Sequence, residues 1–513
     1  MTAKPFARRV RVLDATLREG DQAAGFAFSR EEKISLAEAI AGLGVDVIEA
    51  GFPLSSPADF ESCAAISRLM ASPGSPLVSV MCRAIPEEIA SSARAFADPS
   101  RGILHLTLPA SDRHACVKLG LGRAGVLALV REAVSCAAGL AGEVELGAED
   151  ATRADPAFLA EYCAVAVDSG AHVVNIADTV GRSLPAETAR LVSVARRSHP
   201  AFRDGRAIIS VHCHDDLGLA LANTLAALSA GAGQAEVTLL GIGERAGNLA
   251  TETFAAVLDE RRETLRVDTG IDLGFVGRTV GLLSSIVGSG LSPLKPVTGT
   301  NARAHASGIH QHGLARDPYT YRSVYRDYAD CPPERFVVSR HSGHAGVVLS
   351  LSRMLGRDPV PGTAEMVLAR AKAGEGTLGP SEILETISGR ERLRTIRAES
   401  FALEYEEGQC ARAVARFAGD SAETAATGSD PRQAIEALVL ARTGFPVSAR
   451  VMSLSGYGIG LGACRTRLYV EAEIKGTQDS ELAVERVGLD PGRLLLESLL
   501  DCVNVAMARA RAP

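Results

Sequence analysis

The sequence predicts an α/β protein with a (β/α)₈ TIM barrel, followed by a mixed helical subdomain and a C-terminal α+β domain of regulatory type. Between Val10 and about Arg262, short apolar segments alternate at a steady interval with amphipathic or Ala-rich segments. Eight strands, each followed by a helix within about 250 residues, are typical of this barrel. An open doubly wound sheet is the rival arrangement.

Each strand of the predicted barrel is a short run of β-branched and aliphatic residues. The helices between them begin after turn residues, and a proline suits the first turn because its missing N–H is not needed there. The expected helices include Arg30–Leu43, Pro57–Leu69 and Pro185–Ser198. The expected strands are Val10–Ala15, Val45–Ala50, Leu77–Cys82, Ile103–Leu108, Val144–Leu146, Val173–Ala177, Ile208–His212 and Glu236–Leu240.

The pattern changes after the barrel. We expect a catalytic barrel over residues 1–267, helical linker subdomains over 268–397 and a regulatory domain over 398–513. The last region has β-like segments and helices after two prolines. These segments are Ser400–Tyr405, Ala411–Phe417, Val447–Ser453 and Arg467–Ile474, with helices after Pro431 and Pro491.

Composition excludes several classes of protein. The chain of 513 residues has 54 Lys and Arg against 61 Asp and Glu, a formal net charge of −7, which argues against nucleic-acid binding. No apolar run approaches the ~18 residues of a membrane helix, and the N-terminus lacks the apolar core of a secretory signal. The ten cysteines form no CxxC pair and are expected to be buried thiols in a reducing cytoplasm.

Polar residues follow the predicted strands where a barrel of this kind builds its active site, at the strands' C-terminal ends. The pair His212 and His214 is the sharpest of these features. Alternate residues of a strand face the same side, so both imidazoles should point to the barrel axis while Cys213 points away. Two imidazoles and a carboxylate from another strand would bind a divalent ion, with Mg²⁺, Mn²⁺ and Zn²⁺ all open. Two ordinary polar loop residues are the alternative.

Acidic residues supply the remaining candidates. Glu19 is the expected carboxylate ligand, and the alternative is that it caps a helix or pairs with Arg18. If Arg18 is not paired in this way, it can neutralise the negative charge that develops on a substrate oxygen. Glu149 is a candidate base, and the alternative is an ion pair with Arg153. The glycine-rich run Gly241–Gly247 resembles a phosphate loop only weakly, because it departs from GxGxxG at its last glycine.

Several long motifs in order then resemble the 2-isopropylmalate synthase and homocitrate synthase family. The resemblance covers the barrel and continues to about residue 350, and it is looser in the C-terminal region. The motifs are TLREGDQ around Arg18, EAGFPLSSPADFE from Glu49, EDATRADPAFLAEY from Glu149, SVHCHDDLGLALANTLAA around His212, GIGERAGN from Gly241 and SGIHQHG from Ser307.

This resemblance implies a metal-dependent Claisen condensation of acetyl-CoA with a 2-oxo acid, most simply 2-oxoisovalerate, giving a 2-alkylmalate and CoA. It further implies a homodimer with amino-acid feedback, as in leucine biosynthesis. The implied metal ligands are Glu19, His212, His214 and Asn248. The implied catalytic residues are Arg18, Glu149, His310 and Tyr321, with His310 arriving from this chain or from a partner subunit. Substrate contacts are expected from His105, Thr179, Arg83 and Arg113.

Departures from the family pattern leave the acceptor open. Glu19 stands where isopropylmalate synthases usually have Asp, and Gly147-Ala148 precedes Glu149 in place of Ser-Pro. Both features are similar to homocitrate synthases, which use an acidic 2-oxo acid such as 2-oxoglutarate. Arg113 would pair with such a second acidic group, unless it simply faces solvent. A lyase that catalyses the reverse cleavage is less favoured, because the loop after the eighth strand has no Cys. A non-catalytic regulatory or binding protein is the least favoured alternative.

Overall fold

The computed structural model describes residues 8–287, 292–321, 334–374, 376–391, 396–406, 410–458, 464–474, 481–488 and 490–510. The chain divides into two compact units, of which the first holds the described residues up to Val287 and the second those from Ser292 onward.

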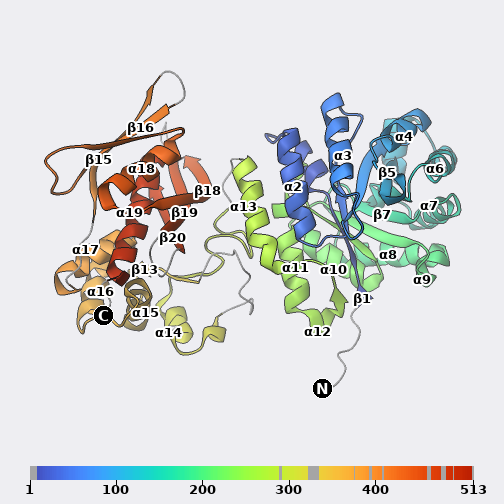
Figure 1. The fold of residues 1–513 in the computed structure, drawn as a ribbon. Coiled ribbons are helices and arrows are strands. Elements are labelled where there is room, and N and C mark those ends of the chain that lie inside the picture. Colours follow the sequence, from blue (N-terminus) through green and yellow to red (C-terminus); the bar gives the residue numbers. More distant parts are fainter. Residues whose placement is uncertain are drawn as a thin grey trace. The chain divides into compact units, whose positions relative to one another are not determined.

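The first unit is a closed barrel of eight parallel strands, β2 to β9 in chain order, with β2 paired to β9 (Figure 1). The predicted barrel is therefore confirmed. Its strands are β2 (Arg11–Asp14), β3 (Val47–Glu49), β4 (Leu77–Arg83), β5 (Gly102–Pro109), β6 (Glu143–Glu149), β7 (Val173–Asp178), β8 (Ile208–Cys213) and β9 (Gln234–Val237).

Helices surround the strands, and their starts follow ordinary capping chemistry. Ser29 and Glu32 form a capping box at α2, and Ser56 accepts from the Asp59 N–H before Pro57 at α3. The main helices are α2 (Arg30–Gly42), α3 (Pro57–Leu69), α4 (Pro86–Ala93), α6 (Arg123–Ala137), α7 (Pro156–Asp168), α8 (Pro185–Ser198), α9 (Ala201–Asp204), α10 (Ala220–Ala230), α11 (Thr251–Glu260) and α13 (Val276–Val287).

The eighth barrel strand was predicted too late in the sequence. It covers Gln234–Val237, and Leu239–Gly241 form a turn of 3₁₀ helix instead. Leu240 and Gly241 both have positive φ, 58° and 68°, which an extended strand does not allow. The apolar run therefore leaves the sheet early and becomes the loop beside the candidate site.

The barrel interior is apolar on one side and polar on the other. Leu13, Ala15, Val47 and Ile103 form a small buried cluster across β2, β3 and β5. On the other side the buried inward positions carry Glu145, Asn175, Ser210, Gln234 and Glu236. Barrels of this kind are usually filled by Val, Ile and Leu. Since buried polar groups are costly unless they are hydrogen-bonded, the polar half is a candidate for a functional role.

The second unit combines a helical layer with two three-stranded antiparallel sheets. Helix α19 belongs to two apolar clusters: Leu496 and Leu499 pack with the sheets, and Val505 packs with the helices. The helices are α14 (Gly308–Arg316), α15 (His344–Leu355), α16 (Thr363–Ala373), α17 (Pro380–Glu391), α18 (Pro431–Thr443) and α19 (Pro491–Ala510). The sheets contain β15 (Ala398–Glu406), β16 (Cys410–Phe417) and β17 (Thr424–Gly428), and β18 (Val447–Gly458), β19 (Cys464–Ile474) and β20 (Glu481–Gly488). Strands β17 and β20 were not predicted.

Two further expectations can be compared with the structure. Within the described residues, no helix has both the length and the apolarity that crossing a bilayer requires. Seven cysteines whose side chains are described are free thiols, but they are not all buried as predicted: Cys116 is exposed and Cys136 is half-buried.

Lys33 holds α2 against two neighbouring segments. Its side chain is 2% exposed, and its ammonium nitrogen lies 2.7 Å from an Asp21 oxygen and 2.9 Å from an Asp59 oxygen. Burial lowers the lysine pKa, but the hydrogen bonds that Lys33 donates to Asp21 and Asp59 outweigh it, so that the pKa is raised and Lys33 stays charged.

We predict that Lys33→Ala lowers the free energy of unfolding by about 3 kcal/mol, because it leaves two carboxylates without their cation. Urea unfolding of both proteins measures this difference. Arg30→Ala is the control, since Arg30 pairs with Glu61 at 3.5 Å on the surface and should contribute less than about 1 kcal/mol. Equal effects of the two variants would contradict the assignment.

Candidate metal centre and active site

Glu19 is presented by a single helical turn, α1 (Thr16–Glu19), which follows β2. The turn is fixed at both ends. The Asp14 carboxylate accepts hydrogen bonds from the Thr16 N–H at 2.9 Å and the Thr251 hydroxyl at 3.1 Å. Thr16 in turn accepts the Leu239 N–H at 2.8 Å, so that the ends of β2 and β9 are tied together below Glu19.

Glu19, His212 and His214 converge, as predicted. One ligand atom of each lies within 4.8 Å of the others, and all three residues are buried. His212 Nε2 is 3.3 Å from His214 Nε2 and 3.5 Å from Glu19 Oε1. Cys213 is buried on the opposite side of β8 near Thr224, as the alternation of the strand requires.

A carboxylate below the site sets the orientation of His212. His212 Nδ1 lies 2.8 Å from Glu236 Oε2, and Asn175 donates to the other Glu236 oxygen. Because Nδ1 donates to a carboxylate, the neutral ring carries its lone pair on Nε2, which points at Glu19 and His214. A lone pair facing a carboxylate requires a positive charge between them, either a proton or a cation.

The residues present fit a divalent cation. Glu19 Oε2, His214 Nδ1 and Asn248 Oδ1 are all buried without a hydrogen-bond partner. The backbones of His214 and Asn248 form a β-bridge, which places Asn248 next to the cluster. A Cβ on Gly243 would lie 2.2 Å from Asn248 Nδ2 and 3.3 Å from Glu19 Oε2, so the glycine keeps this side of the cluster open. Imidazole and oxygen donors of this kind suit Zn²⁺ and Mn²⁺, and oxygen donors also suit Mg²⁺.

Arg18 is shared between two buried acids. It forms an ion pair with Glu19, the alternative considered for that residue, and its Nε lies 2.6 Å from Glu49 Oε2. Burial alone would raise the pKa of Glu19, but the charges of Arg18, His212 and His214 lower it to about 2. Glu19 is therefore an ionised carboxylate, and its ion pair with Arg18 does not exclude metal binding.

His105 contacts the second of these two acids, Glu49. Its Nδ1 lies 2.6 Å from Glu49 Oε1. Burial lowers the pKa of His105, but the charge of Glu49 and its hydrogen bond with the ring outweigh it and raise the pKa to about 9, so the ring is cationic near neutral pH. A Cβ on Gly147 would come within 3.2 Å of His105 Nε2. The glycine therefore leaves room beside the second donor of this buried ring.

A second buried group of metal-ligand type, His105, Glu145 and Glu236, lies among the polar side chains of the barrel interior. Burial raises the pKa of Glu145 to about 8, so this carboxyl is largely protonated at neutral pH. Gln234 donates to both Glu145 oxygens at 3.0 Å. With its acids already hydrogen-bonded or protonated, this group serves as support for the site above it.

Glu149 lies at the end of β6 with a partner that was not predicted. Lys118 Nζ lies 2.7 Å and 2.8 Å from its two oxygens, and His114 Nδ1 lies 3.4 Å from Oε1. The alternative partner, Arg153, instead pairs with Asp150 at 2.7 Å, which corrects that interpretation. Glu149 therefore forms an ion pair with Lys118 and not with Arg153.

The remaining barrel candidates differ in their surroundings. The Thr179 hydroxyl, after β7, accepts the Asp150 N–H at 2.9 Å. Arg83 is exposed and pairs with Glu88. Arg113 is exposed on the short turn that follows β5. None of these three contacts the histidine cluster in the structure.

His310 and Tyr321 belong to the second unit, and the structure brings them together. Their rings are stacked, with centroids 4.0 Å apart and planes inclined by 16°. Both side chains are exposed, Tyr321 by 38%. Two residues eleven positions apart in the sequence thus form one exposed pair.

Sequence reasoning missed Glu236, which holds the candidate ligand His212, Glu49, which contacts Arg18 and His105, and Lys118, which pairs with Glu149. It also missed the buried Glu145 below the site. A signal was present for Glu236, because Gln234 and Glu236 are polar at alternate positions of a buried strand. Their partners lie on other strands, and the sequence alone does not give that register.

We predict that Glu236→Gln weakens Mn²⁺ and Zn²⁺ binding by about 10–100-fold, because it loosens the orientation of His212. Calorimetric titration of metal-free protein measures the affinity. Glu132→Gln, an exposed residue of α6, is the matched control and should bind as the wild type does. An unchanged affinity in Glu236→Gln would refute the supporting role.

Comparisons with known proteins identify the family of this chain. A family model described as HMGL-like matches residues 9–280. The chain is 43% identical to the 2-isopropylmalate synthase of Solidesulfovibrio magneticus over 65% of this chain and 64% of that protein. It is 37% identical to the 2-isopropylmalate synthase of Pyrococcus furiosus over 78% of this chain and 84% of that protein.

A solved structure is also similar in its barrel. It is an HMG-CoA lyase from Acenitobacter baumannii in complex with coenzyme A and 3-methylmalate, with 21% identity, a TM-score of 0.47 and coverage of 56% of this chain and 93% of that one. The family match and the two synthase relatives decide the assignment. The chain belongs to the HMGL-like family, within its group of enzymes related to 2-isopropylmalate synthase.

Proposed function

We propose that this chain catalyses the condensation of acetyl-CoA with a 2-oxo acid, giving a 2-alkylmalate and CoA. One observation supports it above the others: the ligand atoms of Glu19, His212 and His214 converge beside the guanidinium of Arg18. The relatives named 2-isopropylmalate synthase support 2-oxoisovalerate as the acceptor.

A divalent ion bound by Glu19, His212, His214 and Asn248 would act as a Lewis acid toward the keto group of the acceptor. Arg18 would lie beside that oxygen and stabilise the negative charge that develops on it. His105, protonated through its contact with Glu49, would donate from its open Nε2 side to an anionic acceptor group.

The condensation also needs a base to remove a proton from the acetyl methyl group. Glu149 is the candidate in the barrel, and Lys118 holds its carboxylate in place. Thr179 and Arg83 are proposed to contact the acceptor. We assign acid–base roles to His310 and Tyr321, supplied by this chain or by a partner subunit. Their support is the exposed, stacked pair and the SGIHQHG motif around His310.

An acidic acceptor such as 2-oxoglutarate is the second candidate. One observation favours it: Arg113 is exposed at the C-terminal end of the barrel strands and has no ion pair among the described residues. A reverse, lyase-type cleavage has less support, since the loop from Leu240 to Asn248 contains no Cys.

We further propose that residues 398–513 form a dimerisation and feedback domain, with residues 268–397 as helical linkers. Its two sheets and the helix α19 are the support. An amino acid is the expected effector. The free thiols of the described cysteines support a reducing, cytoplasmic location.

Release of CoA should require a 2-oxo acid, and kcat/KM should be highest with 2-oxoisovalerate. A thiol-trapping assay with acetyl-CoA, metal and either 2-oxoisovalerate, 2-oxoglutarate or pyruvate measures this. A preference for 2-oxoglutarate that Arg113→Leu abolishes would select the second candidate. Absence of CoA release with all three acceptors would contradict the proposed reaction.

His310→Ala is expected to lower kcat by about 10²–10⁴-fold through loss of an acid–base group, while metal affinity stays unchanged. His312→Ala is the matched control, because His312 is exposed on the same helix two residues away. Steady-state kinetics and metal titration together test the role. Wild-type turnover by His310→Ala would exclude it.

A further inference from the structure

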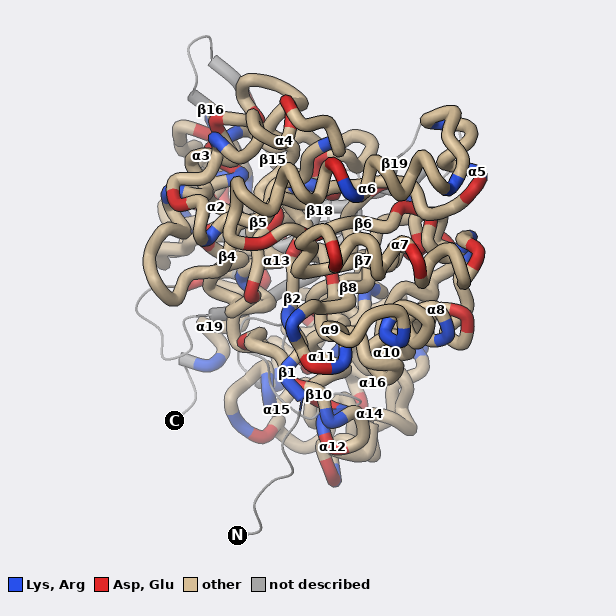
Figure 2. The backbone as a smooth tube through the Cα atoms, turned by 90° about the vertical axis from the view of Figure 1, so that its right-hand side faces the viewer, with Lys and Arg blue, Asp and Glu red and all other residues tan. Residues whose placement is uncertain are grey.

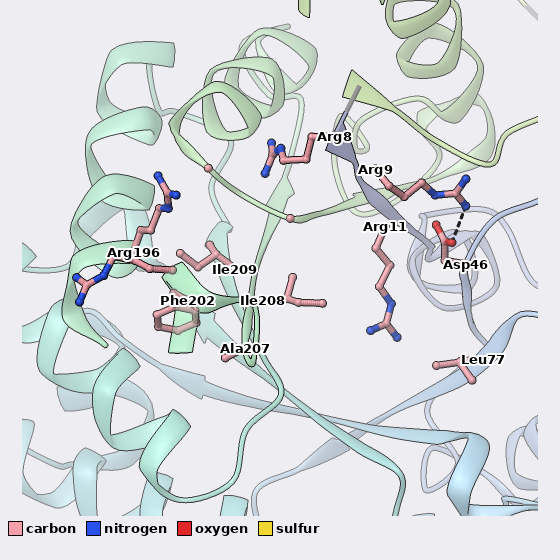
Figure 3. A pocket seen from close by; sticks show the side chains of 14 residues that line it. Arg8, Arg9, Arg11, Asp46, Leu77, Arg196, Phe202, Ala207, Ile208 and Ile209 are labelled. Atoms are coloured by element: carbon pink, nitrogen blue, oxygen red, sulfur yellow. Dashed lines mark hydrogen bonds and ion pairs between the residues drawn. The ribbon is translucent and has the colours of Figure 1, made fainter. Parts of the chain in front are cut away.

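A second cavity lies at the opposite end of the barrel from the candidate metal centre. Its volume is about 610 Å³, and its lining includes the first residues of three strands: Arg11 of β2, Leu77 of β4 and Ile208 of β8 (Figure 3). The ligand cluster follows the ends of β2 and β8 instead. The cavity is therefore separate from the site described above, and its volume falls within the range of small-molecule sites.

Arginine dominates the charge of this cavity. The five arginines come from four elements: β1 (Arg8–Arg9), β2, α8 and α9. Asp46 is the one acidic side chain among the described lining residues. Figure 2 shows basic segments along β1 and β2. The arginines that line it are Arg8, Arg9, Arg11, Arg196 and Arg203.

Three of these side chains are held in place by the barrel. Arg9 pairs with Asp46 at 2.8 Å, and Arg11 pairs with Glu143 at 2.6 Å. Arg8 donates to the carbonyl oxygens of Leu228 and Ala232 at 2.7 Å and 2.8 Å, next to the C-terminus of α10. The Nη2 atom of Arg11 is buried and has no hydrogen-bond partner. One N–H donor of a residue that lines the cavity is thus left without a partner.

The other two arginines have no carboxylate partner among the described residues. Arg196 and Arg203 are both exposed. Arg196 packs against Gly231, where a Cβ would lie 2.8 Å from its Cδ, so its stem is held in place. Burial and the charge of Arg196 lower the pKa of Arg8, as expected where positive charges are not fully neutralised.

Favourable placement near helix C-termini accounts for part of this pattern. Arg196 lies in the last turn of α8, and Arg203 lies in the last turn of α9, where a cation interacts well with the helix dipole. The same effect covers Arg8, which donates to carbonyl oxygens next to the C-terminus of α10, but it does not explain why Arg11 lines this cavity with a buried, unpaired Nη2. An anionic ligand explains this feature of Arg11.

We propose that this cavity binds a compact organic polyanion with two or three negative charges on phosphate or carboxylate groups. Guanidinium groups bind both through paired N–H donors. Phe202, Ile208 and Ile209 add an apolar side to the lining, which would contact a short apolar part of the ligand (Figure 3).

Calorimetric titration of the full chain with pyrophosphate and with benzene-1,3,5-tricarboxylate tests the site. The second probe lacks the 2-hydroxy acid group that would chelate a metal at the other end of the barrel. We expect at least one probe to bind, and binding to weaken by at least about 10-fold in the double variant Arg196→Ala/Arg203→Ala and with added salt. The probe that binds more tightly shows whether the cavity prefers phosphate or carboxylate groups.

Two controls locate the binding. Arg190→Ala/Arg197→Ala removes two exposed charges of α8 that do not line the cavity and should bind as the wild type does. Glu19→Gln alters the opposite end and should also retain binding. The proposal is overturned if neither probe binds the wild type, if Arg196→Ala/Arg203→Ala binds as tightly as the wild type, or if Glu19→Gln abolishes binding.

Discussion

The hydrogen bond between His212 and Glu236 is the interaction on which the candidate site depends. It fixes the proton of His212 on Nδ1 and turns the Nε2 lone pair toward Glu19 and His214. Glu236, on β9, is itself held by Asn175 of β7, and β8 lies between these two strands. Without this orientation, the two histidines would be ordinary buried polar residues. With this orientation, the two histidines and Glu19 present converging ligand atoms that require a cation between them.

The polar half of the barrel interior follows from this requirement. An isolated buried carboxylate is unfavourable, so each acid near the site is protonated or paired. Arg18 bridges Glu19 and Glu49, His105 adds a second cation on Glu49, and burial keeps Glu145 largely neutral. The apolar cluster around Leu13 and Val47 maintains packing on the other side. The barrel thus gives up part of its usual apolar filling to support a charged site.

Much of this arrangement could be predicted from the sequence, because it depends on local patterns. Strand alternation placed His212 and His214 on one face, and strand ends placed Glu19 near them. The supporting acids could not be predicted, since Glu236 and Glu49 gain their meaning from partners on distant strands. The eighth strand was predicted too late in the sequence because the apolar residues continue past its end. The positive φ of Leu240 and Gly241, which hydrophobicity does not reveal, excludes both residues from the strand. His310 and Tyr321 lie in the second unit, so local patterns say nothing of their place in the reaction.

Anomalous diffraction from crystals grown with Mn²⁺ tests the central claim most directly. We predict one strong peak within coordination distance of His212 Nε2, His214 and the Glu19 carboxylate. A peak on His105, Glu145 and Glu236 instead, or no peak in the barrel, would contradict the account.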